Sequence, residues 1–297
     1  MGYPTVPWES MTMTDWSMIL SISLIQNMFY ATLMASILCG IIGTYVVIKR
    51  IVFVSGGIAH ATFGGVGFAY YVQSVLLVSW FDPMIGAMVF AVGAALIIGS
   101  PRVNQRLRDD STIGVLWVVG MALGVLFINL TDHSVVQVRS YESILFGNVL
   151  LVSTQDLQIM AIMIVVILAV VAFLYRDLQI VTFDEAHARI TGINVTLMNT
   201  LLYVLVAITC VFVMNIVGIV LVIALLTMPA ALASMFSNDM RKIMGLAIVS
   251  ATILSLLGLV LAIEFDIPPG ASIVLTLGVF FMISMGIKTL HEKGYIS

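Results

Sequence analysis

The sequence predicts an all-α polytopic membrane protein with about nine transmembrane helices. Of its 297 residues, 61% are hydrophobic and only 9% are charged, and the mean hydropathy is +1.16, which soluble globular domains do not approach. A helix that spans a bilayer needs about 20 apolar residues, so the length admits roughly eight to ten spans. The few charges lie between the apolar segments, and no basic run indicates nucleic acid as a partner.

The apolar segments predict one membrane domain over residues 18–290, with a polar extracytoplasmic segment before it (1–17) and a short polar tail after it (291–297). Pro229 predicts a kink in the seventh segment, and the number of spans falls to eight if that segment is re-entrant. The predicted spans cover, approximately, residues 18–48, 52–78, 84–99, 113–130, 157–175, 200–215, 217–235, 243–263 and 271–290.

Three details refine this topology. The first span is long for one crossing, which predicts an interfacial start or a strong tilt. The connection over residues 131–155 has an apolar half that predicts a short surface or re-entrant helix. Cys39 and Cys210 lie in apolar segments without CxxC spacing, so we expect two small core residues and neither a disulfide nor a zinc cluster.

The basic residues predict the orientation of the chain. With nine alternating spans and the N-terminus outside, eleven of the twelve lysines and arginines are cytoplasmic, and only Arg139 lies outside. The outer face is then acidic and would concentrate cations, although ordinary solvated loop charges are the alternative. Glu264 and Asp266 lie at a span end beside two prolines, and they are our candidates for an outer entrance.

His60 is the one ionisable residue that the sequence places deep in the hydrocarbon. On a helix it shares a face with Gly56, Gly64 and Gly67, and Gly57 begins a second stripe of small residues beside it. An ionisable group at this depth normally faces a bundle interior or a water-filled cavity, because exposure to lipid costs roughly 2.5–3.5 kcal/mol. Two interpretations stay open: His60 lines a pore, or it donates to a carbonyl of a neighbouring helix while the glycines allow close packing.

The stretch FDEAHARITGINVTLMN, residues 183–199, is the clearest signal outside the spans. Asp184 and Glu185 fall in the first turn of a short helix, where negative charge is favourable, and Gly192 is placed to end that helix. A short helix over about 184–192, held between two spans, predicts a cytoplasmic surface on which another protein docks. An ordinary interfacial loop is the alternative.

No sequence pattern indicates catalysis. The chain has no Walker lysine motif, no HExxH or GxSxG motif and no paired carboxylates within its spans. We therefore predict neither an enzyme nor a permanently bound cofactor. The energy for any transport must come from an ion gradient or from another subunit.

Five strings cover most of the chain in a consistent order, and together they are specific. They are GIIGTYVVIKRIVFVSGGIAHATFGG from Gly40, FGNVLLVSTQDL from Phe146, FDEAHARITGI from Phe183, GIVLVIALLTMPAALA from Gly218 and FDIPPGASIVL from Phe265. The chain resembles the permease subunit of the manganese/zinc/iron family of bacterial and archaeal ABC importers. The resemblance implies the vitamin B12-importer-like, type II architecture.

The family resemblance also implies partners and a location. The partners are a second copy of the permease, two ABC ATPase subunits and an extracytoplasmic metal-binding protein. The location is the cell membrane of a bacterium or archaeon. The pathway would follow the two-fold axis of the homodimer. The family's coupling helix, which sits in a cleft of the ATPase, corresponds here to Glu185, Ala186 and Gly192, with Asp184 directly before them.

The same resemblance bears on the cargo. The family commonly has an aspartate four residues before the pore histidine, and this chain has Gly56 in that position and His60 in the histidine position. Imidazole suits zinc better than manganese, which prefers oxygen ligands, so we expect a divalent transition metal with zinc favoured over manganese or iron. The expected mechanism is alternating access, with His60 as a site that binds weakly enough to release the ion.

Three alternatives remain at this stage. An iron-chelate or cobalamin permease would need a wider polar or aromatic lumen without a titratable residue at its waist. A gradient-driven secondary carrier would need paired carboxylates or broken helices in matching halves, and the sequence has neither. A membrane scaffold without transport activity would not need a coupling segment.

Overall fold

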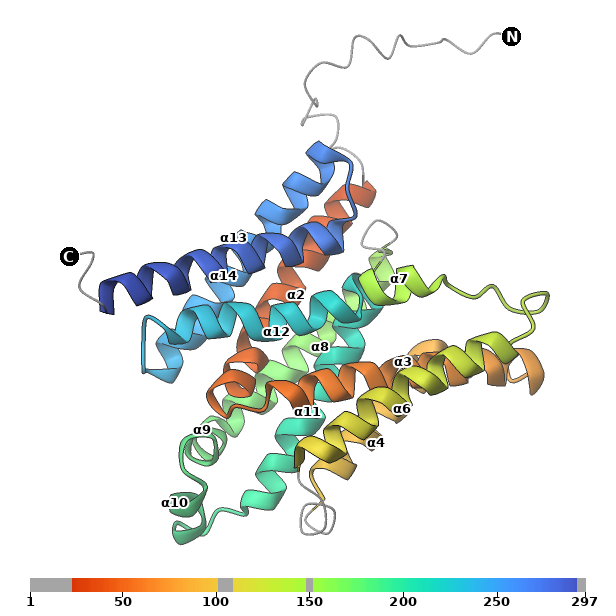
Figure 1. Cartoon of the computed structure of the whole chain (residues 1–297). Coiled ribbons are helices and arrows are strands. Elements are labelled where there is room, and N and C mark those ends of the chain that lie inside the picture. The colour runs from red at the N-terminus through yellow and green to blue at the C-terminus, as the bar shows by residue number, and fades with distance from the viewer. Residues whose placement is uncertain (1–22, 101–108, 148–151, 293–297) are drawn as a thin grey trace, which may run out of the picture.

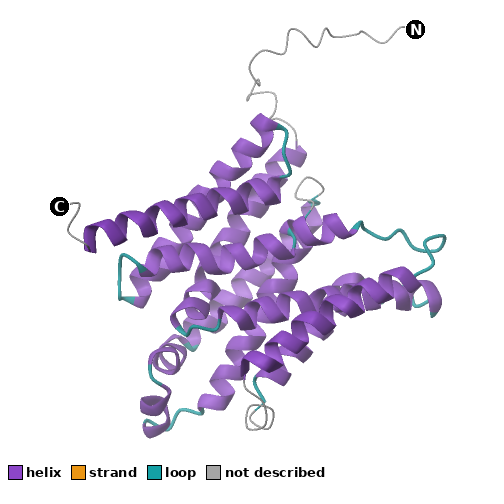
Figure 2. Ribbon diagram, viewed as in Figure 1, coloured by secondary structure: helices purple, strands orange, loops and turns teal. Residues whose placement is uncertain are grey.

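The computed structural model describes residues 23–100, 109–147 and 152–292. In this part of the chain the secondary structure is helical, with no strand (Figure 2). The expected all-α architecture is therefore confirmed. The predicted segment 1–17, three arginines of the basic loop and the last five residues of the predicted tail lie outside the described residues: Arg102, Arg106, Arg108 and residues 293–297.

Each predicted span corresponds to an apolar helix. Seven helices contain a stretch long and apolar enough to cross a bilayer: α2 (Ser23–Ile48), α3 (Val52–Val75), α6 (Asp109–Leu130), α8 (Thr154–Phe173), α11 (Val195–Val217), α13 (Met240–Phe265) and α14 (Pro269–Glu292). The other two are α4 (Pro83–Ile98) and α12 (Ile219–Ser234), with 16 residues each. At 1.5 Å per residue they cover about 24 Å of a hydrocarbon core of about 30 Å.

Polar side chains set the starts of several helices. Asp82 caps α4 by accepting the amide of Met84 at 2.8 Å, and Ser153 and Asp156 form a capping box at the start of α8. Asn194 and Asp239 cap α11 and α13 in the same way. Each satisfies amides that the first turn of a helix leaves unpaired. The cap at Asn194 explains why α11 begins five residues before the predicted span.

Helix α3 packs against both α4 and α6, which contact each other little. The three helices form one half of the bundle (Figure 1). Within its most apolar window, 83% of the residues are buried, whereas the corresponding share is 22% for both α6 and α8. The helix that carries His60 is thus enclosed by protein within a single chain. Helices α6 and α8 leave most of their surface free for lipid or another protein.

Two glycines allow α7 (Tyr141–Phe146) to pack against the junction between α11 and α12. Gly147 follows α7 with φ of 81°, and Gly218, with φ of 83°, is the one residue between α11 and α12. A Cβ atom on either glycine would overlap the backbone of the other segment. The 131–155 connection thus contains a short helix, at Tyr141–Phe146, and residues 148–151 of its apolar half lie outside the described residues. The end of α7 packs against the break between α11 and α12.

The bundle has two ends, which we call the α7 end and the α10 end (Figure 1). The α10 end carries α9 (Tyr175–Phe183) and α10 (Glu185–Ile190). Of the eight lysines and arginines in the described residues, seven lie at the α10 end or in the helix turns next to it, and Arg139 lies at the α7 end. The charge asymmetry on which the predicted orientation depends is present, and the orientation itself stays a prediction.

Candidate functional site

His60 lies in the central part of α3 with its side chain against α6. Its Nδ1 is 2.8 Å from the carbonyl oxygen of Gly56, one turn earlier on the same helix, and its ring stacks on the indole of Trp117 with centroids 4.1 Å apart and planes 19° apart. The residue is 9% exposed. A carbonyl oxygen can only accept, so Nδ1 carries the proton in the neutral ring and Nε2 keeps its lone pair.

The glycines around His60 bring α3 close to α6. A Cβ on Gly56 would come 2.5 Å from Trp117, one on Gly64 would come 2.9 Å from the Gly120 carbonyl oxygen, and one on Gly67 would come 2.5 Å from the Gly124 carbonyl oxygen. The expected second stripe is also packed, because a Cβ on Gly57 would come 2.9 Å from Ile113 of α6. These small residues permit backbone approach, as at many membrane helix interfaces.

Sequence reasoning missed Trp117 as the partner of His60. The signal that could have found it is the pair Gly120 and Gly124 on α6, a small-xxx-small pattern that matches the glycine face of α3. The indole occupies the space that a side chain at position 56 would need. The absence of a side chain at Gly56 therefore leaves the space that the Trp117 ring fills.

The segment predicted to couple to the ATPase contains the expected short helix, although α10 is shorter than expected. Asp184 caps α10 by accepting the amides of Ala186 and His187, both at 2.9 Å, and Gly192 follows the helix with φ of 82°. Ala186 is exposed and Ala188 is fully buried. One face of this six-residue helix thus packs on the bundle and the other is open.

Glu185 points toward the bundle. Its Oε1 accepts a hydrogen bond from Lys49 Nζ at 2.7 Å and another from Asn199 Nδ2 at 3.0 Å. Lys49 Nζ also donates to the carbonyl oxygen of Val181 at 3.1 Å. Burial alone would raise the pKa of Glu185, but the two hydrogen bonds and the positive charge of Lys49 outweigh it, so the pKa lies below its ordinary value. Glu185 is therefore ionised at neutral pH.

The predicted outer-entrance residues lie at the α7 end. Asp266 ends α13 in a left-handed conformation with φ of 51°, and both Glu264 and Asp266 are exposed. They do not line the cavity at that end. Within the described residues, no group of three or more histidine, cysteine, aspartate or glutamate side chains converges on a common point.

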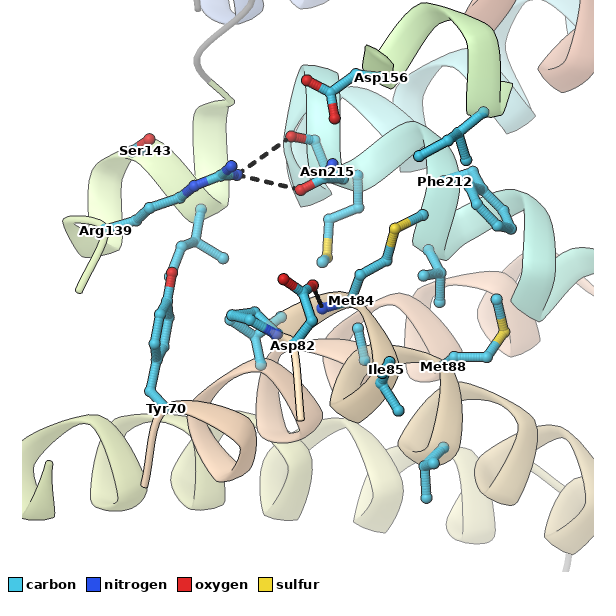
Figure 3. A pocket seen from close by; sticks show the side chains of 18 of the residues that line it. Tyr70, Asp82, Met84, Ile85, Met88, Arg139, Ser143, Asp156, Phe212 and Asn215 are labelled. Atoms are coloured by element: carbon cyan, nitrogen blue, oxygen red, sulfur yellow. Dashed lines mark hydrogen bonds between the residues drawn. The ribbon is translucent and has the colours of Figure 1, made fainter. Parts of the chain in front are cut away.

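A cavity of about 730 Å³ opens at the α7 end between α3, α4, α8 and α11 (Figure 3). Arg139 points toward Asn215 and donates to its side-chain oxygen at 3.2 Å, while the carboxylates of Asp82 and Asp156 are engaged in helix caps. On α3 the cavity is lined by Val66 and Tyr70. Val66 is six residues from His60, about 120° around the helix, so the cavity and His60 lie on different faces.

In the part of the chain that the structure describes, the long apolar helices and the short helix held between two of them define a polytopic membrane protein. The chain belongs to the ABC 3 transport family, whose match covers residues 21–288. The expectation of an ABC importer permease that is not itself an enzyme is confirmed by this match. The expected multi-pass membrane character is confirmed with it.

Named relatives and a solved structure extend this result. The manganese transport system membrane protein MntC of Halalkalibacterium halodurans is 34% identical over 93% of both chains. A probable iron transport system membrane protein of Haemophilus influenzae is 31% identical over 95% of this chain and 100% of that protein. The structure of PsaBC from Streptococcus pneumoniae in complex with Fab superposes with a TM-score of 0.78 at 30% identity, covering 91% of this chain and 93% of that one.

Proposed function

We propose that this chain is the membrane subunit of an ATP-driven importer of divalent transition metal ions in the cell membrane. Two copies would enclose the pathway, two ATPase subunits would bind the α10 end, and an extracytoplasmic metal-binding protein would deliver the ion to the α7 end. Family membership supports the ATP-driven mechanism. The predicted orientation, with the basic α10 end in the cytoplasm, fits these partners.

The position of His60 is the observation that carries the pathway proposal. Among the histidine, acidic and basic residues of the described apolar helices, His60 lies in the central turns, whereas the others lie within the first or last two turns. Its Nδ1 proton is directed to Gly56, which leaves Nε2 as the ring nitrogen that can bind a metal. Because Trp117 covers the ring, metal access requires α6 or its indole to move during alternating access.

The ligand chemistry favours zinc, and the relatives favour other metals. A lone imidazole without a carboxylate beside it suits zinc, and position 56, where a carboxylate would stand, is occupied by glycine next to Trp117. The two relatives described above are named for manganese and for iron. We propose that the cargo is a divalent transition metal, and ligand chemistry favours zinc. The uptake experiment decides among zinc, manganese and iron.

The open face of α10 is the proposed contact with the ATPase. Ala186 is exposed, Ile190 is 85% exposed, and Phe183 directly before the helix is 54% exposed. Apolar side chains with this exposure at the predicted cytoplasmic surface suit a protein partner. Gly192 lies open to solvent after the helix, with no atom within 4 Å of a Cβ built on it, so a partner could approach the backbone there.

Uptake by proteoliposomes tests this function. The vesicles would contain the chain with its co-purified ATPase and binding protein, and radioactive zinc, manganese and iron would be offered with ATP or a non-hydrolysable analogue inside. We expect uptake of one metal in excess of the others, with ATP only. Uptake driven by a proton gradient without ATP, or no uptake of any of the three, would contradict the proposal.

A further inference from the structure

Lys49 is a buried cation at the junction of two functional elements. Its side chain is 8% exposed, and its Nζ lies 2.7 Å from Glu185 of α10. Only Arg50 and Ile51 separate Lys49 from the first residue of α3. The contact thus connects the proposed ATPase-binding helix to the start of the helix that carries His60.

The connection between α2 and α3 is tightly bonded. The amide of Arg50 donates to the Val47 carbonyl oxygen at 3.0 Å, and that of Ile51 donates to the Val46 carbonyl oxygen at 2.9 Å. Arg50 adopts φ of 60°, which reverses the chain in one step. We call residues 49–51 the elbow. The Ile51 carbonyl oxygen also accepts the amide of Val54 at 3.0 Å, so the elbow is hydrogen-bonded to both α2 and α3. A displacement at Lys49 would therefore reach the start of α3.

Glu185 receives hydrogen bonds from the elbow and from a long helix. Lys49 of the elbow and Asn199 on α11 donate to the same oxygen, Oε1. Helix α10 has only six residues, and Ala188 is its one fully buried side chain. With so little apolar contact of its own, α10 is held to the bundle largely by the two hydrogen bonds of Glu185, and the bond from Lys49 is the charged one.

We propose that the Lys49–Glu185 ion pair transmits movement of α10 to the elbow, and through α3 to His60. Glu185 is then a positioning residue directed into its own chain, while the exposed side chains of α10 meet the ATPase. His60 lies eight residues beyond the first residue of α3, about 12 Å along the helix axis. This inference rests on the proposed function, since it requires an ATPase that moves α10.

Lys49→Met tests the proposal in the reconstituted complex with ATPase and binding protein. This variant keeps the length and the apolar stem of the side chain but removes its charge. Lys242→Met is the matched control, because Lys242 is an exposed lysine at the same end of the bundle. We expect both variants to retain the ATPase. We expect Lys49→Met to raise the number of ATP molecules hydrolysed per ion transported about fivefold or more, which is the lower range of typical coupling between sites.

Three further variants separate transmission from simple loss of structure. Lys49→Arg keeps the charge and the hydrogen-bond donors, so we expect the ATP hydrolysed per ion transported to stay close to the wild-type value. The exchange Lys49→Glu with Glu185→Lys should recover part of the loss. Asn199→Ala removes one hydrogen bond and leaves both charges, so it should fold even if Lys49→Met does not fold. We expect it to raise the ATP hydrolysed per ion transported by less than Lys49→Met does.

The outcomes are distinguishable. If wild type shows no ATP-driven uptake, the proposed function itself fails. If wild type transports and both Lys49→Met and Asn199→Ala match Lys242→Met, the ion pair transmits nothing. Release of the ATPase from Lys49→Met would make the ion pair part of the docking surface and would overturn the proposal. A charge exchange that recovers none of the lost coupling would also overturn it.

Discussion

Lys49 and His60 are both buried, yet their hydrogen-bond partners lie at very different distances along the sequence. The ion-pair partner of Lys49 is Glu185, 136 residues away in sequence, whereas the imidazole of His60 is bonded to a carbonyl four residues back on its own helix. A distant partner holds two segments together, and its loss weakens the fold. A partner on the same helix orients the ring without joining segments, so the second ring nitrogen stays available for a ligand.

The two regions also differ in how tightly their surroundings are packed. Around His60, glycines place α3 and α6 so close that an added methyl group has no room. Around Lys49, the partners are a flexible carboxylate that is 43% exposed and a carbonyl group. We therefore expect substitutions near His60 to cost stability through overpacking, and those near Lys49 through loss of charge pairing.

The largest stability effect should come from Gly56→Ala. The new methyl group would stand 2.5 Å from the Trp117 ring, and overpacking of this kind costs about 1–3 kcal/mol. The free energy of unfolding in mild detergent measures this cost. Gly93→Ala is the matched control on α4, because no atom lies within 4 Å of its Cβ position, and it should be neutral or slightly stabilising.

A double variant sharpens this prediction. Trp117→Ala removes the ring that the new methyl group would meet, so Gly56→Ala should cost less in that background than in wild type. Equal costs in the two backgrounds would show that Trp117 does not set the requirement for glycine at position 56.

Lys49→Met should have a smaller effect on stability. Breaking a buried ion pair costs about 3–5 kcal/mol when the remaining charge stays buried, but water reaches Glu185, so we expect about 1–2 kcal/mol. The melting temperature of the purified chain measures it, with Lys242→Met expected to change little. A melting temperature equal to that of wild type would indicate that the pair does not stabilise the fold.

The pH dependence of the same pair should be the smallest effect. The pKa of Glu185 is depressed in the folded chain, from a reference value of 4.5, so its contribution to stability is present above that value and is lost as pH falls through the lower folded pKa. The difference in melting temperature between wild type and Glu185→Gln should be constant from pH 7 to pH 5 and shrink below about pH 4.5. A difference that disappears already at pH 6 would contradict the assigned direction of the shift.

Much of the fold could be predicted because hydrophobicity and length dictate membrane helices. Every predicted span corresponds to an apolar helix, and Asp184 and Gly192 bound the short helix between two spans as their local chemistry requires. These features depend on neighbouring residues in sequence. Helix α11 begins at Val195, earlier than its apolar residues predict, because the Asn194 side chain caps a helix start within a polar stretch.

The tertiary contacts of the candidate residues could not be predicted. The glycine face of α3 indicated close packing, but nothing local identified Trp117 as the ring that covers His60. Likewise, Glu185 was expected to act toward the ATPase, and its pairing with Lys49 depends on how α2 and α10 meet in space. Such long-range pairs follow from the packed bundle and leave no periodic signal in a single sequence.

ATP-dependent metal uptake by His60→Ala is the most direct measurement of the central claim. The variant removes a hydrogen bond within α3 and the stacking of the ring on Trp117. Neither contact lies at the α10 end, so the complex with its ATPase should assemble in wild-type amounts. We predict that uptake of the metal that wild type transports falls to the level of vesicles without ATP. Uptake at the wild-type rate by an assembled His60→Ala complex would contradict the assignment of His60 to the metal pathway.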